Sequence, residues 1–149
     1  MKIGIIGSGG REHAICTFLK ISNKVDKIYC FPGNAGTSFI AENINVNLNN
    51  FDEIKKKIKE LEIDIVIVGP EKPLVEGIVD FLEKNEIKVF GPNKIASQLE
   101  GSKIFTKNLC KKYKIPTANF GVFDNIEKSF EFLKKCKFPL VVKADGLAS

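Results

Sequence analysis

The sequence lacks several features that would place a protein in a common class. It contains no tryptophan, and no apolar run approaches the roughly 20 residues that a membrane helix needs. Its first apolar segment is short and leads directly into glycines, which is not the pattern of a signal peptide. The four cysteines show neither a Cys-x-x-Cys pair nor metal-ligand spacing: Cys16, Cys30, Cys110 and Cys136. We therefore expect a cytoplasmic protein with reduced, mostly buried thiols and no membrane partner.

Basic residues other than lysine are equally scarce. Of 23 lysines and arginines only Arg11 is an arginine, and His13 is the only histidine. The net charge of +5 would fit a nucleic-acid binder, but the lysines gather at 55–59, 111–114 and 134–137, on the polar faces of predicted helices. No nucleic-acid motif accompanies them. Solvated helix faces explain these lysines better than a polyanion-binding patch, and we expect no nucleic-acid partner.

The most informative stretch is the first fourteen residues. Lys2–Ile6 predicts a short strand, glycines 7, 9 and 10 predict a turn, and 11–20 predicts a helix. Glycine lets the backbone approach a ligand, and the first helical N–H groups point toward it with the positive end of the helix dipole. The pattern therefore indicates an anion site, and Arg11 fits it because its guanidinium binds phosphate or carboxylate through two hydrogen bonds. A turn needed only for strand–helix packing remains the alternative, as does a packing role for His13.

Strands and helices alternate along the first hundred residues. We predict strands at 2–6, 25–31, 44–48, 63–68 and 88–90, and helices at 11–20, 52–61 and 74–85, with Asp52 as an N-cap. The strand at 63–68 is a β-branched run typical of a strand covered on both faces. The order predicts an α/β fold, namely an open, mostly parallel sheet with helices on both faces.

The pattern changes near residue 95. We predict helices at 102–113 and 126–136 and strands at 120–123 and 139–144, the last entering a glycine turn that ends at Ser149. A domain rarely stops just after a buried strand, so we expect a truncated chain.

The glycine turn departs from the dinucleotide-binding pattern. Glu12 stands where the third glycine belongs, and the second predicted strand ends in Phe31-Pro32 without an acidic residue. NAD binding is therefore disfavoured against a single phosphate or a phosphosugar. The other charged candidates for a binding site are Glu71, in a proline-flanked loop, Lys103 and Lys143. For each of them, a solvated or structural side chain remains the alternative to a functional one.

Five motifs together resemble the phosphoribosylamine–glycine ligases of the ATP-grasp superfamily, also called glycinamide ribonucleotide synthetases. They run in the family's order from residue 7 to residue 148. The motifs are Gly-Ser-Gly-Gly-Arg-Glu-His-Ala (7–14), Pro-Gly-Asn-Ala-Gly-Thr (32–37), Val-Gly-Pro-Glu-Lys-Pro-Leu (68–74), Leu-Glu-Gly-Ser-Lys-Ile-Phe-Thr-Lys (99–107) and Val-Lys-Ala-Asp-Gly-Leu-Ala (142–148).

The resemblance implies a reaction and a domain division. ATP would phosphorylate the carboxylate of glycine, and the amine of 5-phosphoribosylamine would attack the acyl phosphate, giving glycinamide ribonucleotide, ADP and phosphate in purine biosynthesis. Residues 1–101 would form the Rossmann-like pre-ATP-grasp domain, and 102–149 would begin the ATP-grasp domain. Mg²⁺ or Mn²⁺ would be bound by residues beyond Ser149, so we expect this chain alone to be inactive, and we expect a monomer.

The resemblance also implies roles for individual residues. The phosphoribosylamine pocket would be formed by Gly9, Gly10, Arg11, Asn34, Gly36 and Glu71. Lys103 and Lys143 would reach the ATP phosphates, whose charge lysine neutralises. The alternatives are another ATP-grasp carboxylate–amine ligase or a stand-alone phosphosugar- or nucleotide-binding module.

Overall fold

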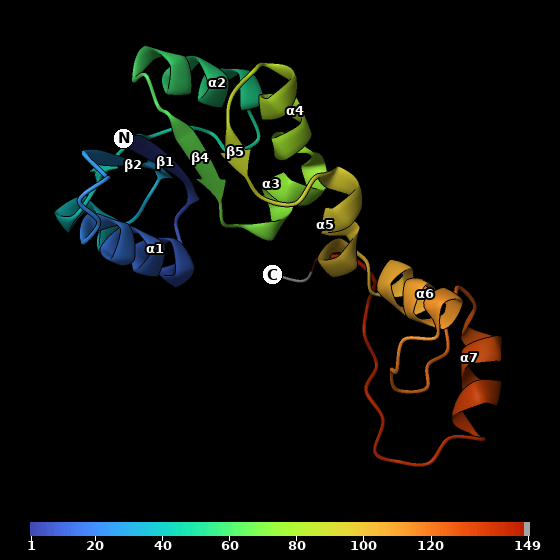
Figure 1. The fold of residues 1–149 in the computed structure, drawn as a ribbon. Helices are drawn as coiled ribbons and strands as arrows, with labels where there is room; N and C mark the ends of the chain where they lie inside the picture. The colour runs from blue at the N-terminus through green and yellow to red at the C-terminus, as the bar shows by residue number, and fades with distance from the viewer. Residues whose placement is uncertain (148–149) are drawn as a thin grey trace. The chain divides into compact units, whose positions relative to one another are not determined.

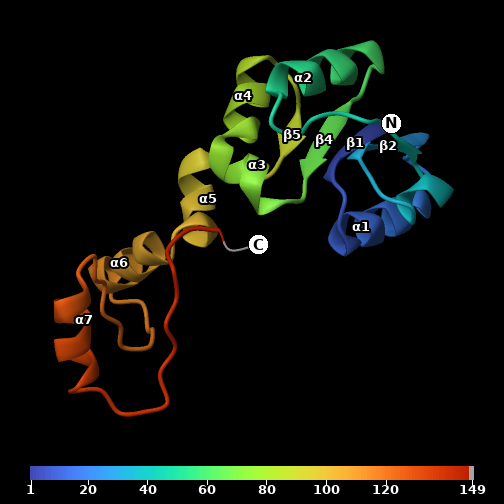
Figure 2. The same ribbon diagram turned by 180° about the vertical axis from the view of Figure 1, so that it is seen from behind.

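A computed structural model describes residues 1–147 and contains two compact units, Met1–Ser97 and a second that begins at Gln98. Figures 1 and 2 show the sheet of the first unit and helices α6 and α7 of the second. Ala148, the last residue of the fifth motif, and Ser149 lie outside the described residues.

The first unit is built on a five-stranded parallel sheet with the strand order β3-β2-β1-β4-β5. Its strands are β1 (Lys2–Gly7), β2 (Lys27–Pro32), β3 (Glu42–Asn43), β4 (Ile65–Val68) and β5 (Val89–Phe90). The strand order reverses between β1 and β4, which pair directly although they are not consecutive. In an open α/β sheet such a reversal leaves a crevice outside the carboxyl ends of the two strands, where ligands bind.

Helices cover both faces of this sheet, as the sequence predicted (Figures 1 and 2). The helical elements of the unit are α1 (Gly10–Lys20), the 3₁₀ turn η1 (Thr37–Phe39), α2 (Phe51–Glu60), α3 (Glu71–Glu76), α4 (Ile78–Lys84) and α5 (Lys94–Gly101), which runs across the unit boundary. Successive strand residues point to opposite faces. Ile5 accordingly packs with Cys16 of α1, whereas Ile6 packs with Ile54 of α2 and Ile78 of α4.

Two predicted elements of this unit were wrong in detail. The segment 44–48 is not a strand: β3 occupies Glu42–Asn43, and Val46 is buried in the core while Ile44 and Leu48 pack against it. The alternation therefore reflected burial rather than a ladder of hydrogen bonds. The predicted helix 74–85 is divided by Gly77, whose φ of 98° is a left-handed conformation that a helix cannot continue through.

The N-cap of α2 also differs from the prediction. It is Asn50, whose side-chain oxygen accepts a hydrogen bond from the Glu53 amide at 3.1 Å, whereas Asp52 lies inside the first turn and pairs with Lys55. We expect Asn50→Ala to lower the free energy of unfolding by about 1 kcal/mol, because the cap satisfies an amide that has no partner within the helix. Urea unfolding measures this. The matched change Asp52→Ala should cost less, about 0.5 kcal/mol, and a larger loss at Asp52 would contradict the assignment of the cap.

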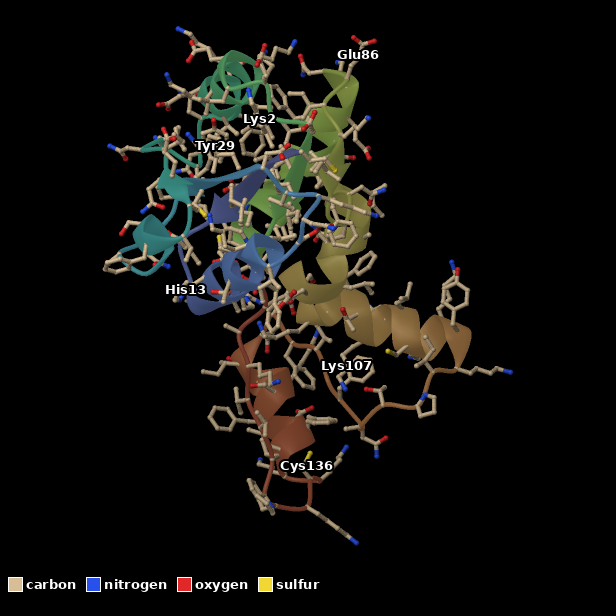
Figure 3. All side chains as sticks on the ribbon, turned by 60° about the vertical axis from the view of Figure 1, so that its left-hand side comes forward. Lys2, His13, Tyr29, Glu86, Lys107 and Cys136 are labelled. Carbon is tan, nitrogen blue, oxygen red and sulfur yellow. The ribbon has the colours of Figure 1, made fainter. Side chains whose placement is uncertain are left out.

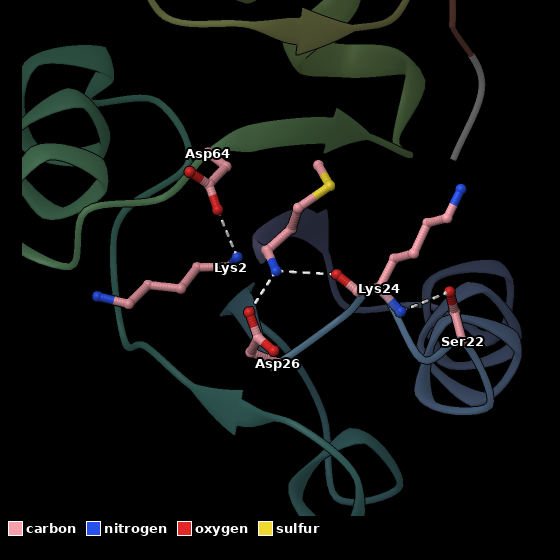
Figure 4. A network of polar contacts seen from close by, with 6 residues as sticks. Lys2, Ser22, Lys24, Asp26 and Asp64 are labelled. Carbon is pink, nitrogen blue, oxygen red and sulfur yellow. Dashed lines mark hydrogen bonds and ion pairs between the residues drawn. The ribbon is translucent and has the colours of Figure 1, made fainter.

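The start of β1 is fixed by contacts with its two neighbouring segments (Figure 4). The ammonium group of Met1 donates a hydrogen bond to the Lys24 carbonyl at 2.8 Å and pairs with the Asp26 carboxylate. The Lys2 amide donates to the Asp64 carboxylate at 2.7 Å. These contacts lie at the amino ends of the strands, so they set the register of β1 at the edge opposite the crevice.

The second unit contains α6 (Lys103–Tyr113) and α7 (Ile126–Leu133), both predicted, but no strand among its described residues. The predicted strands at 120–123 and 139–144 are therefore wrong. A strand needs a partner to hydrogen-bond its backbone, and an isolated pair is marginal in water. Val141 and Val142 are 78% and 82% exposed. The segment 139–144 is apolar in sequence, but no other described segment pairs with it.

Candidate functional site

The glycine turn between β1 and α1 lies at the carboxyl end of the central strand. Gly7 has a φ of 132°, which side chains disfavour, Gly9 is the N-cap of α1, and Gly10 is its first residue. His13 lies on the following turn of the helix. In Figure 3 it is at the opposite end of the unit from Lys2 and Glu86, which are near the amino ends of the strands. The predicted anion turn therefore lies at the edge of the sheet where α/β proteins bind ligands.

Glu12 fills the space behind this turn, a role that the sequence analysis missed. It is 3% exposed, its Oε2 accepts the Gly9 amide at 2.6 Å, and its Oε1 is buried without a hydrogen-bond partner among the described residues. A Cβ added at Gly7 would lie 2.6 Å from its Cδ, and one at Gly69 would overlap its Oε1. Glu12 is the third residue after the N-cap, the spacing of a capping box, and that signal could have found it.

This contact decides which groups of the turn can face an anion. The Gly9 amide is already donated to Glu12, so it is not available to a ligand in this state. Gly10 has open space at its Cα, since an added Cβ would meet no atom within 4 Å. An anion at the start of α1 would therefore be held chiefly by the Gly10 amide, the helix dipole and the Arg11 side chain.

Arg11, in the first turn of the helix that follows β1, forms an ion pair with Glu71, which follows β4. Its Nη2 lies 2.5 Å from Oε1 of Glu71, and the two side chains are 65% and 28% exposed. Glu71 does not lie in a stiff loop as predicted but is the first residue of α3, on the chain that leaves β4. Its own backbone N–H and the Arg11 guanidinium hold the pKa of the Glu71 carboxyl below its usual value, so it is an anion at neutral pH.

The loop after β2 is attached to the same turn. The Asn34 side-chain amide donates to the carbonyls of Ser8 at 2.8 Å and of Gly9 at 3.3 Å, and its oxygen accepts the Thr37 amide at 2.9 Å. A Cβ added at Gly36 would lie 3.0 Å from Nδ1 of His13. Asn34 and Gly36 therefore hold the loop beside the glycine turn, and His13 packs against that loop while remaining exposed.

The structure thus brings together the residues predicted for the phosphosugar pocket at the ends of β1, β2 and β4. Gly9 and Asn34 share a hydrogen bond, and Arg11 and Glu71 share an ion pair. None of these contacts could be read from local spacing, because Arg11 and Glu71 are 60 residues apart. The arrangement suits an anion with polar groups attached, since an amide, a guanidinium and a carboxylate lie together at one end of the sheet.

In the second unit, the motif at 99–107 is hydrogen-bonded to the described part of the motif at 142–148. Ser102 caps α6 through the Phe105 amide and donates its hydroxyl to Asp145, which also accepts the Ile104 amide at 3.1 Å. The Ile104 amide and then the Ser102 hydroxyl lower the pKa of the Asp145 carboxyl. Lys103 Nζ donates to the Gly146 carbonyl at 2.5 Å, whereas Lys143 is exposed. Asp145, which was not among the predicted site residues, thus joins the two motifs together with the Lys103–Gly146 contact.

Other predicted features have simpler outcomes. All four cysteines are free; Cys16 and Cys30 are buried with their sulfurs 3.1 Å apart, whereas Cys110 and Cys136 are partly exposed. Burial raises the pKa of the Cys16 and Cys30 thiols. Within residues 1–147, no three acidic, histidine or cysteine side chains are grouped to bind a metal ion, and no helix is long and apolar enough to span a bilayer.

The parallel sheet with helices on both faces and a glycine turn at its switch point defines a Rossmann-like α/β protein. Comparison with known proteins narrows this class. Residues 1–100 match the family described as phosphoribosylglycinamide synthetase, N domain, and residues 101–149 match its ATP-grasp (A) domain. The chain belongs to the phosphoribosylglycinamide synthetase family.

Individual relatives agree with this assignment. The chain is 50% identical to a phosphoribosylamine–glycine ligase of Caldanaerobacter subterraneus over 99% of its own length and 36% of the relative's. A crystal structure of phosphoribosylamine–glycine ligase from Thermotoga maritima superposes with a TM-score of 0.74 at 36% identity, over 99% of this chain and 34% of that one. The chain thus spans about a third of the length of the relatives it matches.

A more distant structure shares only the fold. It is the biotin carboxylase domain of a Hydrogenobacter thermophilus 2-oxoglutarate carboxylase, determined with MgADP, ADP and bicarbonate. Its TM-score is 0.62 at 22% identity, over 93% of this chain and 33% of that one. The fold class predicted from the sequence, a Rossmann-like unit followed by the start of an ATP-grasp domain, is confirmed by these neighbours.

Proposed function

We propose that the whole protein is a phosphoribosylamine–glycine ligase. It would couple cleavage of ATP to ADP and phosphate with formation of the amide between glycine and 5-phosphoribosylamine, through a glycyl phosphate. The observation that carries this proposal is the 50% identity to a ligase of that name over 99% of the chain, with both family domains matched in order. The product would be glycinamide ribonucleotide, an intermediate of purine biosynthesis.

Within that reaction the first unit would bind the sugar phosphate. The Gly10 amide and the Arg11 guanidinium would hold the phosphate, with Gly9 shaping the turn. Asn34, Gly36 and Glu71 would line the sugar side of the pocket. A guanidinium that can make two hydrogen bonds and a helix N-terminus are both suited to a phosphate dianion. The contacts that bring these residues together also support the assignment.

The second part of the chain would contribute to ATP binding. We propose Lys103 and Lys143 for the ATP phosphates, with the ATP-grasp domain beginning at residue 102. Mg²⁺ or Mn²⁺ would neutralise the phosphates, but the described residues contain no set of ligands for either ion. We propose a cytoplasmic monomer acting on small molecules alone, with this chain by itself inactive because it covers about a third of its relatives.

The experiment is an assay of ADP release by the full-length protein. We expect release that requires both glycine and phosphoribosylamine generated in the assay, and none from residues 1–149 alone. Release that needs neither substrate would move the protein elsewhere among ATP-grasp enzymes. A reading frame that ends at residue 149 would favour a phosphosugar- or nucleotide-binding module over a ligase.

A further inference from the structure

The guanidinium assigned to the phosphate is already paired with a carboxylate. Nη2 of Arg11 lies 2.5 Å from Oε1 of Glu71, a charge-assisted contact of the kind that Arg11 would make with a phosphate oxygen. A carboxylate and a phosphate present similar oxygen acceptors to a guanidinium. Glu71 therefore competes with any anion that arrives at the start of α1.

A second carboxylate adds to this competition. Glu12 is buried behind the turn and already accepts the Gly9 amide. A bare phosphate would thus meet one fewer amide than the turn contains and would have to displace Glu71 from Arg11. It would offer Glu71 only a P–OH proton in return, since its remaining oxygens are acceptors, and the two anions would repel each other.

A phosphosugar changes this balance. Its phosphate can take the place of Glu71 on Arg11, while its hydroxyls or amine donate hydrogen bonds to the released carboxylate. Glu71 is 28% exposed, so it is partly desolvated and gains from a new donor. Glu71 is the first residue of α3 and pairs with Arg11, so it lies beside the proposed phosphate position rather than behind the turn with Glu12.

We infer that Glu71 is a specificity-determining residue of the phosphosugar site: it competes with simple anions for Arg11 and accepts ligands that bring both a phosphate and hydrogen-bond donors. This inference rests on the proposed phosphosugar site. Glu71 makes the binding of a simple anion less favourable and adds a contact with a phosphosugar. Selective sites commonly combine an unfavourable interaction with the wrong ligand and a favourable one with the right ligand.

The test compares inorganic phosphate with ribose 5-phosphate, which carries hydroxyls on the same sugar-phosphate framework. Calorimetric titration of the wild-type chain and of Glu71→Gln gives both dissociation constants. We expect Glu71→Gln to bind inorganic phosphate about fivefold tighter, the upper end of what an exposed ion pair contributes. Because the same change removes the charged acceptor for the hydroxyls, the preference for ribose 5-phosphate over phosphate should fall about tenfold.

The matched control is Glu76→Gln on the same helix, which removes one negative charge from a pair with Lys72 at 3.9 Å. It should change neither constant, which separates a local effect from a change in net charge. If Glu71→Gln leaves phosphate binding unchanged or weakens it while ribose 5-phosphate still binds, the role of Glu71 is overturned and the site survives. If the wild-type chain binds no ribose 5-phosphate, the site itself falls and the inference with it.

Discussion

Arg11→Lys is expected to weaken the binding of ribose 5-phosphate by about 1–3 kcal/mol, on the order of a 5- to 150-fold rise in the dissociation constant. Lysine keeps the positive charge but replaces a planar fork with a single ammonium group, so the second hydrogen bond to a phosphate is lost. Arg11 is 65% exposed, and its replacement should hardly change the melting temperature. Calorimetric titration measures the first effect and thermal unfolding the second.

Glu71→Gln provides the control for this change, because it breaks the same ion pair from the other side. If Arg11→Lys weakened binding only by disturbing the pair with Glu71, both variants would weaken it. We instead expect inorganic phosphate to bind more weakly to Arg11→Lys and more tightly to Glu71→Gln. A lower melting temperature with unchanged binding in Arg11→Lys would show that the arginine is structural.

Gly69→Ala is expected to lower the free energy of unfolding by about 1–3 kcal/mol, the usual cost of inserting a methyl group into a packed site. An added Cβ would lie 2.7 Å from Cδ of Glu12 and would overlap its Oε1. The buried carboxylate would have to move, and the Gly9 amide would lose the oxygen that it donates to. Urea unfolding of the wild type and the variant gives the difference.

Gly10→Ala is the matched control, because an added Cβ there meets no atom within 4 Å. It should be neutral or stabilising by up to about 1 kcal/mol, since alanine favours a helix over glycine. In a Glu12→Ala background the cost of Gly69→Ala should largely disappear, as expected for two groups in contact. An equal cost with and without Glu12 would contradict the contact.

Local patterns were sufficient to predict the framework of the first unit. The β-branched run that contains β4 and the order of strands and helices along the chain indicated a sheet covered on both faces, and the structure confirms it. Patterns failed where hydrogen bonding and burial diverge. Val46 fits the alternating pattern of a strand because it is buried, yet β3 ends at Asn43. Val141 lies in a segment with the apolar composition of a strand, but that segment has no partner strand among the described residues.

The candidate site, like the fold, was predicted only in part from local sequence patterns. The glycine turn and Arg11 could be identified from sequence, because glycines and a lone arginine at a helix start have a direct physical meaning. The Arg11–Glu71 pair could not, since it depends on β1 and β4 being neighbours in the sheet. Glu12 was compared with a dinucleotide pattern, which treated it as a misplaced charge, whereas its spacing from Gly9 is that of a helix cap.

The most direct test of the phosphosugar site is a titration of the isotope-labelled chain with ribose 5-phosphate, followed through the amide resonances. We expect saturable shifts that are largest at Gly10 and Arg11, with smaller ones at Asn34 and Glu71. Arg11→Lys should require a higher ligand concentration for the same shifts. Shifts confined to the lysine-rich segment 111–114, or no saturable shift at the β1–α1 turn, would contradict the account.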